Sequence, residues 1–86
     1  MDEINKTILQ ILTKKDMTSK EIFEELVKMK PTENTAKLKS LIYVRLFSLR
    51  AKGLVDVVGE KNNSHIYSLN KFAYQNVMKN EKNQNR

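Results

Sequence analysis

The sequence predicts an α+β fold that is mainly helical, with a three-helix core, a two-stranded β-hairpin and a C-terminal helix. Apolar residues recur at helical spacing in three successive segments between residues 2 and 52. Two short runs rich in β-branched and aromatic side chains follow, separated by a segment containing Gly and Asn. A chain of 86 residues can bury only one modest core. We therefore expect a single domain over residues 1–79 and a disordered polar tail over 80–86.

The first helix is predicted over residues 2–13. Ile4, Ile8, Ile11 and Leu12 fall on one face of a helix, and polar side chains occupy the opposite face. This pattern is typical of a helix that buries one side in a core.

A second helix is predicted to begin after Thr18 and to end near Lys30. In "MTSKEI" Thr18 is a suitable N-cap, Glu21 completes a capping box, and Met17 with Ile22 forms a hydrophobic staple. Pro31 disfavours helix at the residue before it, so the helix should end there. The expected buried face consists of Ile22, Phe23, Leu26, Val27 and Met29.

The third helix is predicted from about Asn34 to Lys52. Its apolar stripe has spacings of four, four and three residues and consists of Leu38, Ile42, Leu46 and Leu49. Gly53 follows at the C′ position, where the left-handed backbone conformation is easiest for glycine. Basic residues in the last turn favour the negative end of the helix dipole.

A hairpin and a short helix complete the prediction. "LVDVV" (54–58) and "HIYSL" (65–69) read as strands, and "GEKNNS" between them reads as a turn segment. Tyr67 and Leu69 should face the core. Asn70 is a suitable N-cap for a helix over 71–79.

The composition argues against several classes of function. Cysteine is absent and His65 is the only histidine, so we expect no metal and no cofactor. The acidic cluster on the second helix has no catalytic partner, so we expect no enzyme and infer no small-molecule ligand. No apolar run approaches the roughly 20 residues that span a bilayer. We therefore expect no membrane partner and a cytoplasmic location.

Positive charge is concentrated in the second part of the chain. Residues 1–33 carry six basic and seven acidic side chains, whereas residues 34–86 carry ten basic and three acidic ones. The net charge of +6 thus lies entirely in the part that contains the third helix and the hairpin. This asymmetry favours an anionic partner.

Three helices followed by a hairpin, with "LRAKGLV" ending the third helix and "HIYSLN" in the second strand, resemble the small winged-helix transcription regulators. The resemblance covers roughly residues 4–70, and Ser40 and the Leu49–Val55 ending match patterns common in that family. It implies a helix-turn-helix, a third helix in the major groove of double-stranded DNA, and a hairpin that acts as a wing. It further implies a sequence-specific, homodimeric, repressor-like regulator, associated with the nucleoid when bound to DNA.

The candidate DNA contacts come from three places. The front of the third helix is polar and basic, the first residues of the second helix can meet phosphate through backbone N–H groups, and the hairpin tip is polar. Each place also has an ordinary interpretation, as a solvated helix face, a cap or a polar turn. The predicted contacts are Ser19, Lys20, Asn34, Lys37, Lys39, Ser40, Tyr43, Lys61, Asn62, Asn63 and His65.

One feature of the third helix departs from the family pattern. The groove-facing positions fall on Leu41, Tyr43, Val44 and Phe47, and three of these side chains cannot donate a hydrogen bond. Either the helix enters the groove with its earlier turn, or this face meets protein. We favour the first, with the three apolar residues lying partly in a dimer or against the C-terminal helix. The alternative function is a protein-interaction module that docks through Leu41, Val44 and Phe47.

Two further interpretations concern packing between elements. Phe72, Tyr74 and Val77 on the last helix are the candidate homodimer interface, and intramolecular packing is nearly as good an explanation. Arg45 lies about 60° from Ile42 around the third helix, so we expect it to pair with Glu24 or Glu25.

Overall fold

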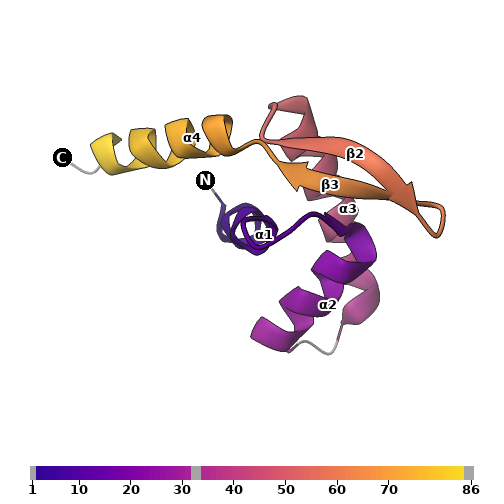
Figure 1. Cartoon of the computed structure of the whole chain (residues 1–86). Coiled ribbons are helices and arrows are strands. Elements are labelled where there is room, and N and C mark those ends of the chain that lie inside the picture. The colour runs from indigo at the N-terminus through magenta and orange to yellow at the C-terminus, as the bar shows by residue number, and fades with distance from the viewer. Residues whose placement is uncertain (1, 32–33, 85–86) are drawn as a thin grey trace.

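The computed structural model describes residues 2–31 and 34–84, with side chains up to residue 80. Helices α1 and α2 precede α3, the hairpin β2–β3 follows, and α4 ends the described chain (Figure 1). The elements are α1 (Glu3–Leu12), β1 (Met17–Thr18), α2 (Ser19–Met29), α3 (Thr35–Ala51), β2 (Val55–Lys61), β3 (Ser64–Leu69) and α4 (Lys71–Gln84). The α+β class is confirmed, and the order is consistent with a winged helix.

The core lies where α1, α2 and α3 meet one face of the sheet. Its fully buried side chains include Ile8 and Ile11 from α1, Ile22 from α2, and Leu46 and Leu49 from α3. The predicted stripe on α3 is confirmed at three positions, with Leu38 packed at the edge of the core. Met29 was predicted to be buried but is 54% exposed, because it lies in the last turn of α2, beyond the core.

The predicted start of α2 and the predicted end of α3 are confirmed in their hydrogen bonds. Thr18 and Glu21 form the reciprocal capping box at the start of α2. Gly53 has φ +78°, and the N–H groups of Gly53 and Leu54 donate to the carbonyls of Arg50 and Leu49. These two bonds form a Schellman motif, which turns the chain directly from α3 into the sheet.

The sheet has three strands rather than the two predicted. β1 pairs antiparallel with β3, Met17 opposite Tyr67 and Thr18 opposite Ile66, which gives the order β1-β3-β2. Sequence patterns do not reveal a strand this short, because two residues cannot show an alternation. Its pairing fixes the start of α2 against the hairpin.

The hairpin is longer and tighter than the sequence predicted. The strands extend through Lys61 and from Ser64, so only Asn62 and Asn63 remain in the turn, with φ of 52° and 64°. Positive φ at both residues is the signature of a type I′ turn, which suits the strand twist and which asparagine tolerates. A bulge lies at Val58, between the pairs Val57–Tyr67 and Gly59–Ile66. Residues 59–61 beyond it carry no apolar side chain, so the sequence did not mark the longer strand.

Helix α4 continues to Gln84, whereas the sequence predicted a helix over 71–79 and a disordered polar tail over 80–86. Residues 85–86 of that tail lie outside the described residues. Extending an existing helix costs far less than nucleating one, and Glu, Lys and Gln are good helix formers. The hairpin tip and α4 extend in opposite directions from the body (Figure 1).

None of the described helices is both long and apolar enough to cross a membrane.

Candidate nucleic-acid interface

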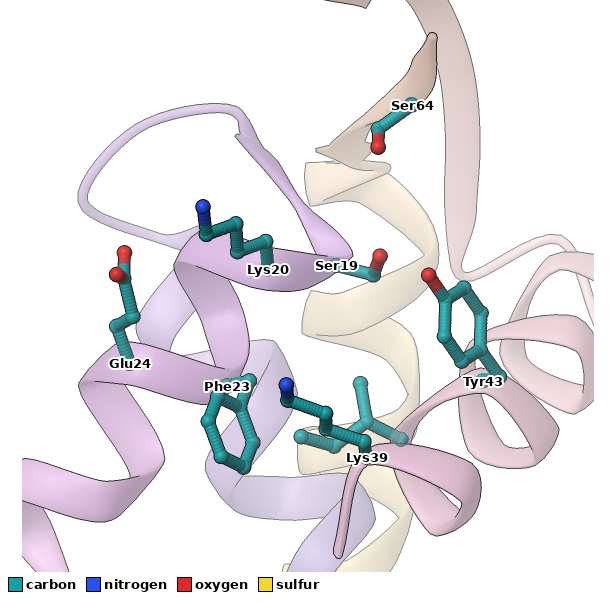
Figure 2. A pocket seen from close by; sticks show the side chains of 8 residues that line it. Ser19, Lys20, Phe23, Glu24, Lys39, Tyr43 and Ser64 are labelled. Carbon is teal, nitrogen blue, oxygen red and sulfur yellow. The ribbon is translucent and has the colours of Figure 1, made fainter. Parts of the chain in front are cut away.

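A hollow of about 410 Å³ lies where the first turns of α2 meet α3 and the beginning of β3. Four predicted contacts line it: Ser19, Lys20, Lys39 and Tyr43 (Figure 2). The Ser19 and Tyr43 hydroxyls point towards one another in this view. The hollow thus gathers two amines and two hydroxyls from α2 and α3, groups that hydrogen-bond to phosphate oxygens.

Sequence reasoning missed the other residues of this hollow. They are Phe23, Glu24, Ile42 and Ser64. Ser64 was assigned to the turn, and only the longer β3 places it beside α2. Phe23 was assigned to the core, but it is half-buried, with the Lys39 ammonium 5.1 Å from the centre of its ring. This cation–π contact holds the Lys39 charge beside α2.

A second hollow of about 300 Å³ lies between the start of α2 and the hairpin tip. Its lining includes the predicted contacts Lys20, Lys61 and Asn62. Lys20, Glu24 and Ser64 line both hollows, so the two adjoin along α2. Together they form a surface that runs from α3 across the N-terminus of α2 to the wing.

The hairpin β2–β3 is tied to α2 by an ion pair. The Lys61 ammonium lies 3.3 Å from the Glu21 carboxylate, which also accepts a hydrogen bond from the Thr18 backbone N–H at 2.9 Å. The Thr18 N–H bond, together with Lys61, lowers the pKa of Glu21 from its ordinary value. The capping carboxylate therefore also orients the hairpin, a role that the sequence pattern did not reveal.

Five predicted contacts line neither hollow. Asn34 caps α3, with its side-chain oxygen accepting from the Lys37 N–H at 3.1 Å, and the Lys37 and Ser40 side chains are exposed on α3. Asn63 occupies the turn, and His65 is exposed on β3 with its ring edge-on to Tyr67. The structure thus divides the predicted set between the hollows and exposed positions on α3 and the hairpin.

The outward face of α3 is apolar. Tyr43 is 58% exposed, Val44 63% and Phe47 77%, whereas Leu41 is half-buried. Of the two predicted locations for Val44 and Phe47, packing against the C-terminal helix within one chain is therefore wrong, and packing in a dimer stays a prediction. The reason is geometric: α4 extends away from α3 and does not cover this face (Figure 1).

Arg45 pairs with Asp2, at 2.8 Å, so the prediction of Glu24 or Glu25 as its partner is wrong. The position of Arg45 around α3, about 60° from Ile42, does not by itself show which neighbouring helix supplies the acidic partner. Asp2 also caps α1 by accepting from the Ile4 N–H at 2.8 Å. Arg45 thus joins α3 to α1 and turns away from the outward face.

The candidate dimer residues on α4 differ in exposure. Phe72 is 76% exposed, whereas Tyr74 and Val77 are half-buried against the core of the same chain. Two of the three residues of the candidate homodimer interface therefore already pack within the chain.

Among the described side chains, no group of three or more His, Asp or Glu residues is placed to hold a metal ion.

Two solved structures, the complex structures of hsRosR-S4 and of hsRosR-S1, are similar to this chain. The TM-scores are 0.76 and 0.75 over 95% of this chain, at 23% identity, and the match spans 69% and 70% of the other chains. Neither a family model nor a curated protein matches the sequence. The chain therefore has the α+β fold of these RosR structures.

Proposed function

We propose that this protein is a winged-helix regulator that binds double-stranded DNA sequence-specifically, with α3 in the major groove and the hairpin β2–β3 as the wing. The observation that carries the proposal is the surface formed by α3, the start of α2 and the hairpin. It joins Lys20, Lys39 and Lys61 with exposed hydroxyl and amide groups. The likeness to the RosR complexes supports the fold on which this proposal rests.

The charges on this surface suit a polyanion. Residues 35–51, which form α3, contain no Asp or Glu and contribute Lys37, Lys39 and Arg50 to its exposed side. The positive end of the α2 dipole and the N–H groups of its first turn lie beside the Lys20 side chain, an arrangement that attracts phosphate. Glu21 and Glu24 are the acidic residues on this surface, and Lys61 neutralises the first.

The finer proposal is a homodimeric, repressor-like regulator without enzymatic activity, acting in the cytoplasm on the nucleoid. Residues 1–79 would form the DNA-binding domain, and α4, through Phe72, would contribute to the dimer seam. Two copies would then place two α3 helices in successive major grooves about 34 Å apart on a near-palindromic site.

The proposal is tested by selecting bound duplexes from a random library and titrating the selected duplex at several salt concentrations. We expect affinity that falls steeply with salt, because phosphate contacts release counterions. Lys37→Ala combined with Lys39→Ala should lower the salt slope by about 2 if each lysine contacts one phosphate. The mass of the free protein, measured alongside, tests the dimer.

The matched control is Lys14→Ala combined with Lys15→Ala, which removes the same charge from exposed positions after α1. This variant should retain the salt slope. An equal decrease of the salt slope in both variants would indicate nonspecific electrostatic attraction. An unchanged slope in the α3 variant would show that Lys37 and Lys39 do not contact phosphate.

The second candidate function is a protein-interaction module, and the exposure of Val44 and Phe47 is the observation that favours it. A protein that selects no duplex and shows no salt-dependent DNA binding would support this function over the first.

A further inference from the structure

The exposed apolar patch on α3 needs a partner that the chain itself does not provide. Phe47 follows Tyr43 by four residues and Val44 by three, so the three side chains lie together on adjacent turns. The residues between and beside them, Ile42, Leu46 and Leu49, are at most 1% exposed and fill the core. The patch is therefore the side of α3 that faces away from the core.

The surroundings of the patch indicate the chemistry of its occupant. The side chains beside it on α3 are Lys37, Lys39, Ser40 and Arg50, and all four are exposed. Asp2 pairs with Arg45, which lies on the α1 side of the helix. An apolar centre bordered by cations and a hydroxyl matches a surface that carries apolar groups between two rows of negative charge.

The major groove of DNA has this character where thymine is present. Its two edges are phosphate backbones, and the 5-methyl group of thymine is an apolar feature on its floor. The patch supplies no amide or guanidinium at its centre, so bidentate reading of guanine or adenine there is excluded for these three residues.

We infer that Tyr43, Val44 and Phe47 contact thymine 5-methyl groups in the major groove, so that the protein selects thymine-containing sites. This inference rests on the proposed DNA-binding function and names the feature of DNA that the centre of α3 recognises. Phe47, the most exposed of the three, makes the largest contact. Lys37, Lys39 and Arg50 bind the flanking phosphates and so determine how deeply α3 enters the major groove.

The test replaces thymidine with deoxyuridine, one position at a time, in the duplex selected from the random library. Deoxyuridine keeps the hydrogen-bonding edge of thymine and lacks only the methyl group. We expect binding to weaken by roughly fourfold for each methyl group that the protein buries, a factor that corresponds to the transfer of one methyl-sized group from water. Phe47→Ala should weaken binding to the thymidine duplex and abolish the difference between thymidine and deoxyuridine at its own position.

The matched control is Met29→Ala, which removes a large exposed side chain at the far end of α2. It should retain the thymidine preference of the unaltered protein. A selected duplex that binds equally well with deoxyuridine at every position, or that lacks thymine at its selected positions, would overturn the inference while leaving DNA binding intact. Absence of any salt-dependent duplex binding would instead overturn the proposed function and leave the patch to a protein partner.

Discussion

Helices α2 and α3 pack against the same core but differ on their outer faces. Beyond Ile22 and Leu26, α2 presents mostly charged side chains, including Glu24 and Lys28, so its outer face is hydrated by solvent. In contrast, α3 presents Val44 and Phe47 to solvent and contains no carboxylate. The outer face of α2 is thus compatible with exposure to water in a monomer. In contrast, α3 has a second, apolar face that is suited to a partner.

This difference shows why the fold alone does not locate the function. Both helices satisfy the requirements of packing, and each carries a buried stripe at helical spacing. The information about function lies in what remains when the core residues are set aside. On α2 the remainder beyond the first turn is an ordinary solvated surface, and on α3 it is an apolar patch with a basic border.

The sharpest test of this comparison uses adjacent residues on the two faces of α3. Leu46 is fully buried and Phe47 is 77% exposed. Leu46→Ala should lower the free energy of unfolding by about 2–5 kcal/mol, because it leaves a cavity in the core. Phe47→Ala should change it by no more than about 0.5 kcal/mol. Urea unfolding followed by circular dichroism measures both.

A large loss of stability in Phe47→Ala would contradict the comparison, since it would place Phe47 in a packed interface of the free protein. If that loss depended on protein concentration, the interface would lie between two copies of the chain.

The helices were predictable because their signals are local. The capping box at Thr18 and Glu21, Pro31 after α2 and Gly53 after α3 each act through backbone groups a few residues away. Such signals can be read from a single sequence without knowledge of the fold.

The sheet was less predictable because its features depend on distant residues. β1 is a strand only because Met17 and Thr18 pair with β3, some 50 positions later in the chain. Likewise, residues 59–61 carry no apolar side chain, and only their pairing with β3 shows that the outer part of the hairpin is strand rather than loop.

The candidate site was predictable in residue type but not in arrangement. Net charge by segment pointed to α3 and the wing, yet it did not show that Lys61 pairs with Glu21 or that Lys39 lies over Phe23. The partner of Arg45 was missed for the same reason. Which acidic side chain reaches a helix face depends on how α1 crosses α3, and this crossing is a tertiary property.

A second test compares the N-caps of the two helices. Thr18 is buried and belongs to a reciprocal capping box, whereas Asn34 is exposed to solvent and its side-chain oxygen accepts from the Lys37 N–H. Thr18→Ala should therefore cost about 1 kcal/mol and Asn34→Ala less. For a domain of this size 1 kcal/mol corresponds to roughly 4–8 °C in Tm. Thr18→Ser, which keeps the hydroxyl acceptor, is the control, and a larger loss in Asn34→Ala would contradict this ranking.

The smallest expected effect concerns the charge that joins α2 to the wing. The hydrogen bond from the Thr18 N–H and the Lys61 ammonium lower the pKa of Glu21 below its ordinary value of 4.5. The stabilisation from this carboxylate is therefore fully present above about pH 4.5 and is lost as the pH falls through the lower pKa of the folded protein. Glu21→Gln can keep the capping box but removes the charge.

We accordingly expect Glu21→Gln to have a slightly lower Tm than the unaltered protein at neutral pH, with the two values converging as the pH falls below 4.5. Thermal unfolding at a series of pH values measures this difference. Glu3, whose pKa Lys30 lowers in the same way, titrates in both proteins and cancels in the comparison. A gap that widens towards acidic pH would mean that Glu21 carries no stabilising charge. The link from the start of α2 to the hairpin would then rest on the pairing of β1 with β3 and on the packing of α2 against β3.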